Sequence, residues 1–500
     1  GLHRVHQRFF SAEVGVDPEL DEFAARYGNL FASDFDMLRC PRISLAEVLR
    51  LLMKWKYILS NCLDSRLSRH DGTMQLEQRS PSMASYSSCA VEVPGQYRVD
   101  HEPLMEQHVF ISAIETNYYA VQSFGHSKSR HCRLAIRASD GSLTEFLLQT
   151  VPPETTRSDT RVSQLFEQVN RLMSAHASCQ NRSLQVVAPN IIPVTPRTRL
   201  LEQGRDFKTI AAIVDEYCAR EGINAAEPTI VLKNAAVLPA PDFLIDEPFQ
   251  KRLEQKRSAF QEICTTHIPS NILCDHVLQQ LQTHERFWHA RKEFTKHTAI
   301  VSYLSYLLSM GHQDPSKIAL SLTSGVTMHA ELRPTYNARG LIETGESVPF
   351  RLTQNMARFI SGVGVQGPLA NAMMAVSNVL KENEGFFEDF LFLLFKDDLA
   401  AQWPLVNVSM EEGMDVDTDE HADAFAFNTY VIKNVYRVLN RLEETTPILM
   451  PSPQDRSTCM ATSRSMHGVH CMNTKIRSLL VEATDEANLC EMSVAWQPWV

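Results

Sequence analysis

The sequence predicts an α+β protein with two lobes, a small lobe in which strands flank one helix and a large lobe that is mainly helical. Two observations support this prediction. Apolar and polar residues alternate in residues 108–116, 132–151 and 183–194, which is the pattern of half-buried strands. After Pro196 the apolar residues instead recur at helical spacing in one segment after another.

Residues 18–65 are predicted to be helical. In residues 44–63 the side chains of Leu52, Trp55 and Leu59 recur on one helix face, and Ser44 is a suitable N-cap. Residues 66–87 are polar and rich in serine, so we interpret them as a connector.

Residues 88–198 predict the small lobe. The pair Asp140-Gly141 lies inside the alternating segment 132–151 and marks the turn of a β-hairpin. A helix is predicted from Asp159 to Ala175, between the strands before and after it.

Residues 199–445 predict the large lobe. Short strands are expected at 317–320 and 325–332, among helices at 208–220, 249–266, 271–282, 284–310, 353–361, 368–382, 386–402 and 421–443. Residues 411–423 form an acidic loop. We interpret it as solvated, because Glu420 and Ala426 stand where an EF-hand calcium loop needs Gly and Glu. Residues 446–470 are a linker, and a final helix at 473–492 leads to an aromatic tail.

The composition is that of an ordinary globular protein, with 44% apolar and 21% charged residues. The net charge of −11 gives no basic field for nucleic acid or an anionic membrane, and we interpret the short cluster 197–199 as a solvated face. The apolar stretch 386–395 is too short to span a bilayer. The eleven cysteines include no C-x-x-C pair, which disfavours a disulfide framework or a zinc module and favours a reducing compartment.

The C-terminal segment "KIRSLLVEATDEANLCEMSVAWQPWV" resembles the FATC segment that closes the phosphatidylinositol-3-kinase-related protein kinases. Further segments resemble the same family in the same order: "SSCAVEVPGQY", "RLAIRASDGSLTEFLL", "PNIIPVTPRTRLLE", "FWHARKEFT" and "SVPFRLTQNM". The ending "AWQPWV" is most similar to the TRRAP-type (transformation/transcription domain-associated) pseudokinase branch.

The resemblance covers nearly the whole chain and implies a protein-kinase-like fold. It divides the chain into six parts: the end of a FAT region with FRB-like helices (1–65), a connector (66–87), a kinase-like N-lobe (88–198), a kinase-like C-lobe (199–445), a linker (446–470) and a FATC segment (471–500). The structural residues of the FATC segment are expected to pack against the large lobe, and they are Leu489, Cys490, Trp496 and Trp499.

Active members of this family carry a phosphate-binding Lys on the strand after the hairpin, and the matching residue here is Gln149. Their catalytic loop reads Gly-Asp-Arg-His and has Asn three residues later. Aligned on Gly311, the corresponding residues here are His312, Gln313, Asp314 and Lys317. A magnesium ligand needs an oxygen, whereas a Lys ammonium has three donors and no acceptor.

The Asp-Phe-Gly motif of the family falls at Ala330-Glu331-Leu332, and no Asp-Phe-Gly occurs anywhere in the sequence. The helix acid Asp159 is retained, and without a Lys to orient we expect it to cap its helix or to pair with a nearby Arg such as Arg157 or Arg161.

The resemblance therefore implies a pseudokinase with no bound cofactor and no metal site. It implies a nuclear, non-catalytic scaffold in histone acetyltransferase coactivator complexes, which contacts other subunits here and activators through upstream regions. No contact with nucleic acid or membrane is expected.

The alternative is a divergent, active Ser/Thr kinase of the same family. In that case Asp314 would act as the base of a His-Arg-Asp-like loop and Glu331 would hold a metal. That template also needs an Asn at the position of Ala319. A lipid kinase is disfavoured by the same replacements.

Overall fold

The computed structural model describes residues 18–37, 50–55, 57–59, 73–97, 104–115, 117–121, 130–150, 158–195, 198–202, 204, 206–236, 247–311, 313–411, 420–445 and 474–500. The chain divides into two compact units. The first takes in Gly1–Tyr86, Ile114–Gln122 and Cys132–Leu134, and the second Ser87–Ala113, Ser123–His131 and Ala135–Val500.

The first unit begins with helices, as predicted. Helix α2 (Pro18–Met37) is followed by helical residues at 50–55 and 57–59. Asp34 accepts hydrogen bonds from Lys54 Nζ at 2.7 Å and from Trp55 Nε1 at 2.8 Å, and the Trp55 ring packs edge-on against Phe31. Leu52, expected on the buried face, is 40% exposed; Leu51 is buried instead. Ser44 lies outside the described residues.

The connector predicted at 66–87 contains regular structure. Strand β1 (Thr73–Gln75) pairs antiparallel with β3 (Asn117–Val121), and two short helices follow it, α4 (Leu76–Arg79) and α5 (Pro81–Ala84). Pro81 lies in the first turn of α5, where its missing N–H leaves no helix hydrogen bond unmade.

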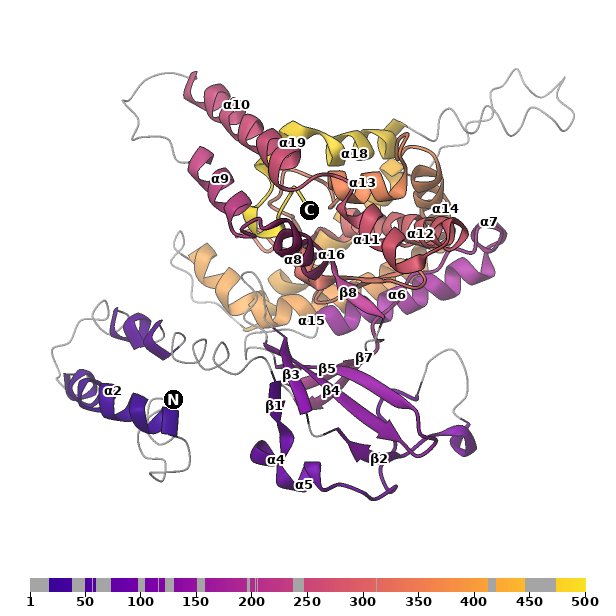
Figure 1. Ribbon diagram of the computed structural model, residues 1–500. Coiled ribbons are helices and arrows are strands. Elements are labelled where there is room, and N and C mark those ends of the chain that lie inside the picture. The colour runs from indigo at the N-terminus through magenta and orange to yellow at the C-terminus, as the bar shows by residue number, and fades with distance from the viewer. Residues whose placement is uncertain are drawn as a thin grey trace, which may run out of the picture. The chain divides into compact units, whose positions relative to one another are not determined.

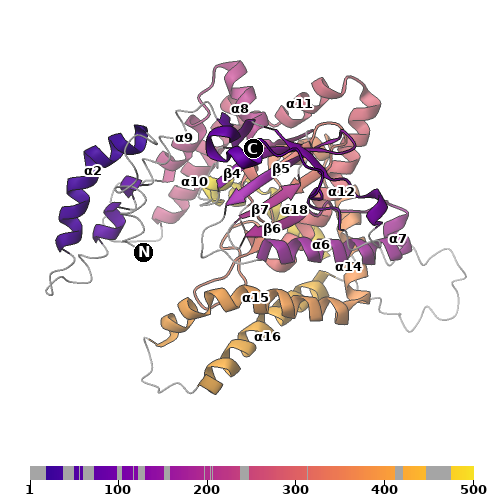
Figure 2. The same ribbon diagram turned by 90° about the horizontal axis from the view of Figure 1, so that it is seen from below.

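In the sheet of the second unit, β2 pairs with β4 (Figure 1). The strand order from β4 onward is β4-β5-β7-β6 (Figure 2). Its strands are β2 (Ile111–Ile114), β4 (Arg130–Ala138), β5 (Leu143–Thr150), β6 (Ile191–Thr195) and β7 (Thr198–Glu202). The predicted hairpin turn joins β4 to β5, with Gly141 at φ +83°. The predicted boundary between residues 198 and 199 falls inside β7, whereas residues 184–190 form no strand.

Helix α6 (Ser158–Ala175) follows β5 and packs against α14 and α15. The remaining helices of this unit are α7 (Ala177–Gln180), α8 (Ile210–Glu221), α9 (Glu227–Ala236), α10 (Glu247–Glu262), α11 (Ile272–Leu281), α12 (His284–Leu308), α13 (Gln354–Ile360), α14 (Pro368–Glu382), α15 (Glu384–Glu411), α16 (Glu420–Thr445), α18 (Thr474–Thr484) and α19 (Glu486–Glu491). One-turn helices lie at Met105–Gln107, Ile263–His267, Pro315–Lys317 and Val494–Trp496.

Helix α12 is the centre of the large helical part. It contacts α11, α13, α14 and α16, and its second half is almost entirely buried (Figure 1). Helices α15 and α16 lie side by side (Figure 2). Thr283 caps the start of α12, and Arg441 Nη1 donates to the carbonyls of Tyr306 and Leu307 at its end, each at 3.0 Å. These caps fix the point at which the chain leaves the helix for the loop at 309–317.

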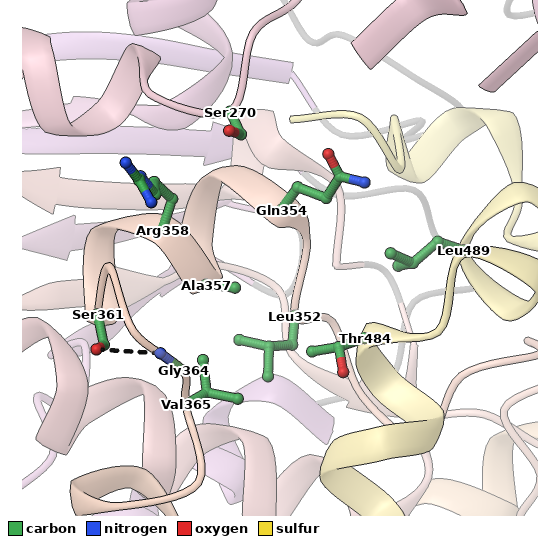
Figure 3. Close-up of a pocket in the computed structure, with 10 residues that line it drawn as sticks. All are labelled: Ser270, Leu352, Gln354, Ala357, Arg358, Ser361, Gly364, Val365, Thr484 and Leu489. Carbon is green, nitrogen blue, oxygen red and sulfur yellow. Dashed lines mark hydrogen bonds between the residues drawn. The ribbon is translucent and has the colours of Figure 1, made fainter. Parts of the chain in front are cut away.

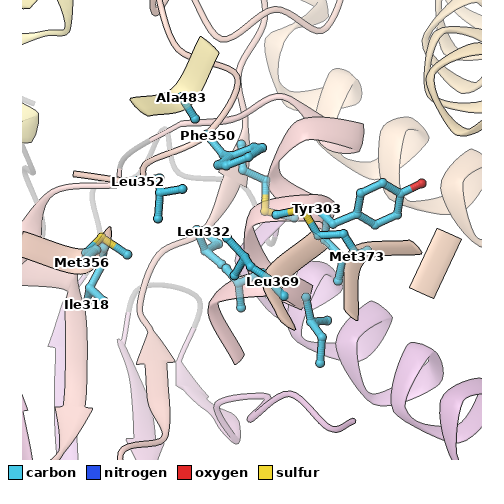
Figure 4. Close-up of a cluster of buried hydrophobic side chains, with 14 of the residues drawn as sticks. Tyr303, Ile318, Leu332, Phe350, Leu352, Met356, Leu369, Met373 and Ala483 are labelled. Atoms are coloured by element: carbon cyan, nitrogen blue, oxygen red, sulfur yellow. The ribbon is translucent and has the colours of Figure 1, made fainter. Parts of the chain in front are cut away.

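Two small sheets flank that loop. Strand β10 (Ile318–Ser321) lies between β11 (Thr327–His329) and β8 (Phe207–Thr209), and β9 (Met310–Gly311) pairs with β12 (Arg333–Pro334). The apolar core beneath them joins α12, α14 and α18 through side chains that include Tyr303, Met373 and Ala483 (Figure 4).

The α+β class and most of the predicted helices are confirmed. Strand β8 and helix α9 were not predicted, and the final helix is two helices, because Asp485 breaks it and caps α19 by accepting from Ala487 N–H at 3.1 Å. Most of the acidic loop, 412–419, and the linker 446–470 lie outside the described residues.

Gly325 turns the chain between β10 and β11 at φ +78°, and a Cβ there would lie 2.1 Å from the carbonyl oxygen of Ala290. Gly345 has a similar φ of +64°, but nothing lies within 4 Å of its would-be Cβ. We expect Gly345→Ala to lower the free energy of unfolding by about 1 kcal/mol through backbone strain alone. Gly325→Ala should lower it by about 3 kcal/mol or more, because the backbone of α12 must also move. Thermal or urea unfolding measures both, and equal losses would contradict the close approach.

Candidate functional site

The predicted site begins on neighbouring strands of the sheet. Gln149 of β5 and Arg199 of β7 are paired residues of an antiparallel ladder, so their side chains lie next to each other on one face. Arg199 Nε donates to Gln149 Oε1 at 2.8 Å. Both side chains are buried, so the expectation of a solvated face at 197–199 was wrong for Arg199.

The Arg199 guanidinium also contacts Asp159, which lies in the first turn of α6. Arg199 Nη1 donates to Asp159 Oδ1, and Arg333 Nη2 lies 3.6 Å from Asp159 Oδ2. A carboxylate at a helix N-terminus also interacts favourably with the helix dipole. The expected pairing with Arg161 was wrong. Arg161 instead pairs with Asp397 on the surface, and Arg157 lies outside the described residues.

The loop after α12 contributes the next two groups. Gly311 lets the chain pass Thr335, whose methyl carbon would lie 2.4 Å from a Cβ at this position. Pro315–Lys317 form a single 3₁₀ turn, in which Lys317 N–H donates to the carbonyl of Asp314 at 2.9 Å. The same turn brings Lys317 Nζ to 3.4 Å from Asp314 Oδ2. His312 lies outside the described residues.

Glu331 connects the loop to the sheet. Its Oε2 lies 3.0 Å from Lys317 Nζ, and its Oε1 accepts a hydrogen bond from Gln149 Nε2. Its backbone is left-handed, with φ +57°, a conformation that costs a non-glycine residue roughly 1 kcal/mol or more. The neighbour Ala330 donates its N–H to the carbonyl of Lys317 at 2.8 Å, and Leu332 enters the apolar core.

These side chains form one connected set, which we call the buried charge network: Asp159, Arg199, Gln149, Glu331, Lys317, Asp314 and Arg333. All except Arg333 are more than nine-tenths buried. Three carboxylates face three cations, so the charges balance. Buried charges persist only when they are paired and hydrogen-bonded. In the network every charge has a partner of opposite sign, although Arg199 Nη2 and Arg333 Nε are buried without a hydrogen-bond partner.

Gln313 precedes Asp314 in the loop and is held by Arg351. Gln313 Nε2 donates to the carbonyl of Met310 at 2.9 Å, and Arg351 N–H donates to Gln313 Oε1 at 3.3 Å. The buried Arg351 guanidinium also donates to the carbonyls of Trp496 and Val500, the latter at 2.7 Å. Burial lowers the pKa of Arg351 to about 9, and attraction to Asp314 partly offsets this effect. Arg351 thus joins the loop to the C-terminal segment.

Each predicted FATC residue lies in the main apolar core, and these residues are Leu489, Cys490, Trp496 and Trp499. Asn355 Nδ2 donates to the carbonyl of Trp499 at 3.1 Å, and Ser347 Oγ to that of Asn488 at 2.7 Å. The segment is therefore held by polar as well as apolar contacts.

The structure adds Arg199, Arg333 and Arg351 to the residues named from sequence. Only the register of β5 against β7 could have pointed to Arg199, since that register makes it the partner of Gln149. The other two arginines approach their partners from segments distant in sequence. Arg351 lies in the family segment "SVPFRLTQNM", but that segment does not indicate what the side chain contacts.

A pocket of about 380 Å³ lies away from the buried charge network, between α13 and the C-terminal helices (Figure 3). Leu352, Ala357, Val365 and Leu489 give it an apolar side, and none of its lining residues belongs to the network. Across the described ranges, no three His, Cys, Asp or Glu side chains converge as a metal site would require. In the same part of the chain, no helix has the length and apolar character needed to cross a membrane.

The family model described as phosphatidylinositol 3- and 4-kinase matches residues 148–404, a range that includes every residue of the buried charge network. The chain is similar to the SAGA complex/NuA4 acetyltransferase complex subunit TRA1 of Saccharomyces cerevisiae, with 27% identity over 71% of this chain and 10% of that protein. It is similar to the transformation/transcription domain-associated protein of Homo sapiens, with 22% identity over 94% of this chain and 11% of that protein.

The chain thus spans about a tenth of the length of these curated relatives. A solved structure described as the open conformation of CtTel1 has the same fold. It matches with a TM-score of 0.61 and 14% identity, over 86% of this chain and 14% of that one.

The Arg199–Asp159 pair can be compared with the exposed Arg161–Asp397 pair, whose side chains are 38% and 45% exposed. We expect Arg199→Met to lower the free energy of unfolding by about 3–5 kcal/mol, because it leaves Asp159 and Gln149 buried with fewer partners. Arg161→Met should cost less than about 1 kcal/mol, because water screens that pair. Urea unfolding of both variants measures the difference. Similar small losses would contradict a tightly coupled network.

Proposed function

Because this chain belongs to the phosphatidylinositol 3- and 4-kinase family, we propose that it keeps the fold of these kinases without their phosphoryl-transfer chemistry. The family resemblance predicted from sequence is confirmed by the match and by the TRRAP-type relatives. On this proposal the chain is the C-terminal portion of a pseudokinase and acts as a scaffold.

The observation that carries the proposal is the buried charge network. Phosphoryl transfer needs cations aimed at the phosphates and oxygen ligands available to magnesium. Here Gln149 stands at the position of the phosphate-binding Lys. Its Oε1 accepts a hydrogen bond from Arg199, and its Nε2 donates one to Glu331. Lys317 stands at the position of a metal ligand and directs an ammonium toward Asp314 and Glu331. Magnesium and nucleotide do not fit this donor set.

The alternative, an active Ser/Thr kinase, requires Asp314 and Glu331 to be available for catalysis. Both carboxylates contact the same ammonium, and Glu331 also accepts from Gln149. An active arrangement would have to break these contacts. The binding energy of Mg-ATP would then have to offset the free energy lost with them.

The relatives suggest the setting of the scaffold. The yeast relative is named a subunit of the SAGA and NuA4 acetyltransferase complexes. We extend this role to the present chain as a nuclear subunit of a histone acetyltransferase coactivator complex that contacts other subunits here and activators through other regions. The net charge of −11 agrees with contacts to protein rather than directly to nucleic acid or membrane.

Nucleotide binding tests the catalytic half of the proposal. We expect the thermal midpoint of the chain to be the same with and without millimolar Mg-ATP, because a ligand stabilises only the state that binds it. Incubation with labelled ATP should transfer no phosphate to the chain or to a generic Ser/Thr substrate. A saturable, magnesium-dependent rise in the midpoint would favour the kinase alternative. At a hundredfold excess of ligand over Kd, binding would stabilise the folded chain by about 2.7 kcal/mol.

Complex formation tests the scaffold half. Affinity purification of the longer protein containing this chain, from its own cells, should recover histone acetyltransferase activity and the acetyltransferase itself by mass spectrometry. Arg351→Ala should reduce that recovery, because it detaches the C-terminal segment from the loop. Arg358→Ala, an exposed change seven residues further on, is the control. Recovery of the protein without any acetyltransferase would contradict the proposed role.

A further inference from the structure

Lys317 lies between two carboxylates that come from separate segments of the chain. Its Nζ lies 3.0 Å from Glu331 Oε2 and 3.4 Å from Asp314 Oδ2. The side chains of Lys317, Asp314 and Glu331 are 7%, 9% and 5% exposed. One positive charge therefore serves two negative charges in a place that water barely reaches.

Without that charge the two carboxylates could not remain as they are. Two buried, ionised carboxylates repel each other and lack the solvation that each would have in water. Two carboxylates that share one cation are also a usual arrangement for Mg²⁺ or Mn²⁺, which prefer oxygen ligands. Lys317 excludes such an ion, because its ammonium is itself a cation and offers no acceptor.

The other end of Glu331 links this arrangement to the sheet. Glu331 Oε1 accepts from Gln149, which in turn accepts from Arg199, which donates to Asp159. Glu331 thus connects the loop to β5, β7 and α6, and the Lys317 ammonium is one of the groups that hold its carboxylate.

We propose that the Lys317 ammonium is a built-in cation that takes the place of a divalent metal between Asp314 and Glu331. It holds the loop against the sheet without metal or nucleotide. The inference rests on the proposed function, in which this site binds no nucleotide. It adds that, once the ammonium is removed, Asp314 and Glu331 form a site that binds a divalent cation.

The test uses the whole chain and compares thermal midpoints in EDTA, in millimolar MgCl₂ or MnCl₂, and in KCl of the same ionic strength. The unmodified chain should give one midpoint in all of them. Lys317→Ala should lower the midpoint in EDTA by roughly 5 °C or more, because Asp314 and Glu331 lose the cation that they share. Mg²⁺ or Mn²⁺ should restore at least half of that loss, whereas KCl should not.

Further variants separate a bound cation from general effects of charge. Lys317→Ala combined with Glu331→Gln removes one carboxylate and should abolish the response to divalent cations. Lys317→Met fills the space with an uncharged side chain. Its midpoint should be lowered, and divalent cations should not raise it again. Lys381→Ala is the matched control, because Lys381 forms an ion pair of the same i,i+3 spacing with Glu384 at 2.6 Å, but on the surface. It should change the midpoint little in any solution.

Two results would overturn the proposal. One is a Lys317→Ala variant as stable in EDTA as the unmodified chain. The other is a destabilised variant whose midpoint divalent cations raise no more than KCl does. If Lys317→Ala does not fold, Lys317→Asn, which offers a neutral oxygen, is judged by the same criterion. Stabilisation of the unmodified chain by Mg-ATP would instead overturn the proposed function, so the two failures are distinguishable.

Discussion

Charge burial at the junction of sheet and loop is the constraint on which the arrangement of this chain depends. An unpaired ion in such a place costs several kcal/mol, and the mutual attraction of ions offsets this only when their geometry is good. The buried charge network meets that requirement because each cation faces a carboxylate and Gln149 connects the two halves. The β5–β7 register, the first turn of α6 and the 3₁₀ turn at Lys317 must therefore all be in place together.

Arg351 is a further buried cation, and it links the loop to the C-terminal segment. It is one of the largest fully buried side chains, and its donors reach the carbonyls of Gln313, Trp496 and Val500. Carbonyl groups satisfy its hydrogen bonds but carry only partial charges, and burial accordingly lowers its pKa to about 9. The loop and the C-terminal segment thus share one buried cation, and a change in either alters the packing of the other.

Much of the fold could be predicted because the determining signals are local. Apolar periodicity located the long helices, and Asp140-Gly141 located the hairpin turn. The loop residues were located through the resemblance to the family's catalytic loop, aligned on Gly311. The break in the final helix was missed although its cause is also local, since Asp485 caps α19 while the apolar pattern continues past it. Periodicity records which face is buried and does not record where one helix ends and the next begins.

The site could be predicted only as a set of replaced residues. Gln149, Asp314, Lys317 and Glu331 were named from their positions in motifs, but what they contact depends on segments far apart in the chain. Arg199 was interpreted as part of a solvated cluster because Arg197 and Thr198 precede it, whereas strand pairing turns it inward against Gln149. Glu331 is similar, because its left-handed backbone aims the carboxylate at Lys317 and no sequence rule anticipates that conformation.

An internal cation and a bound one stabilise a site in different ways. A metal or nucleotide contributes free energy that depends on its concentration, so a kinase site closes and opens with its ligand. The Lys317 ammonium is part of the chain, and its local concentration does not change with conditions. A site closed in this way gives the surrounding surfaces one fixed arrangement, which is what the proposed scaffold function requires.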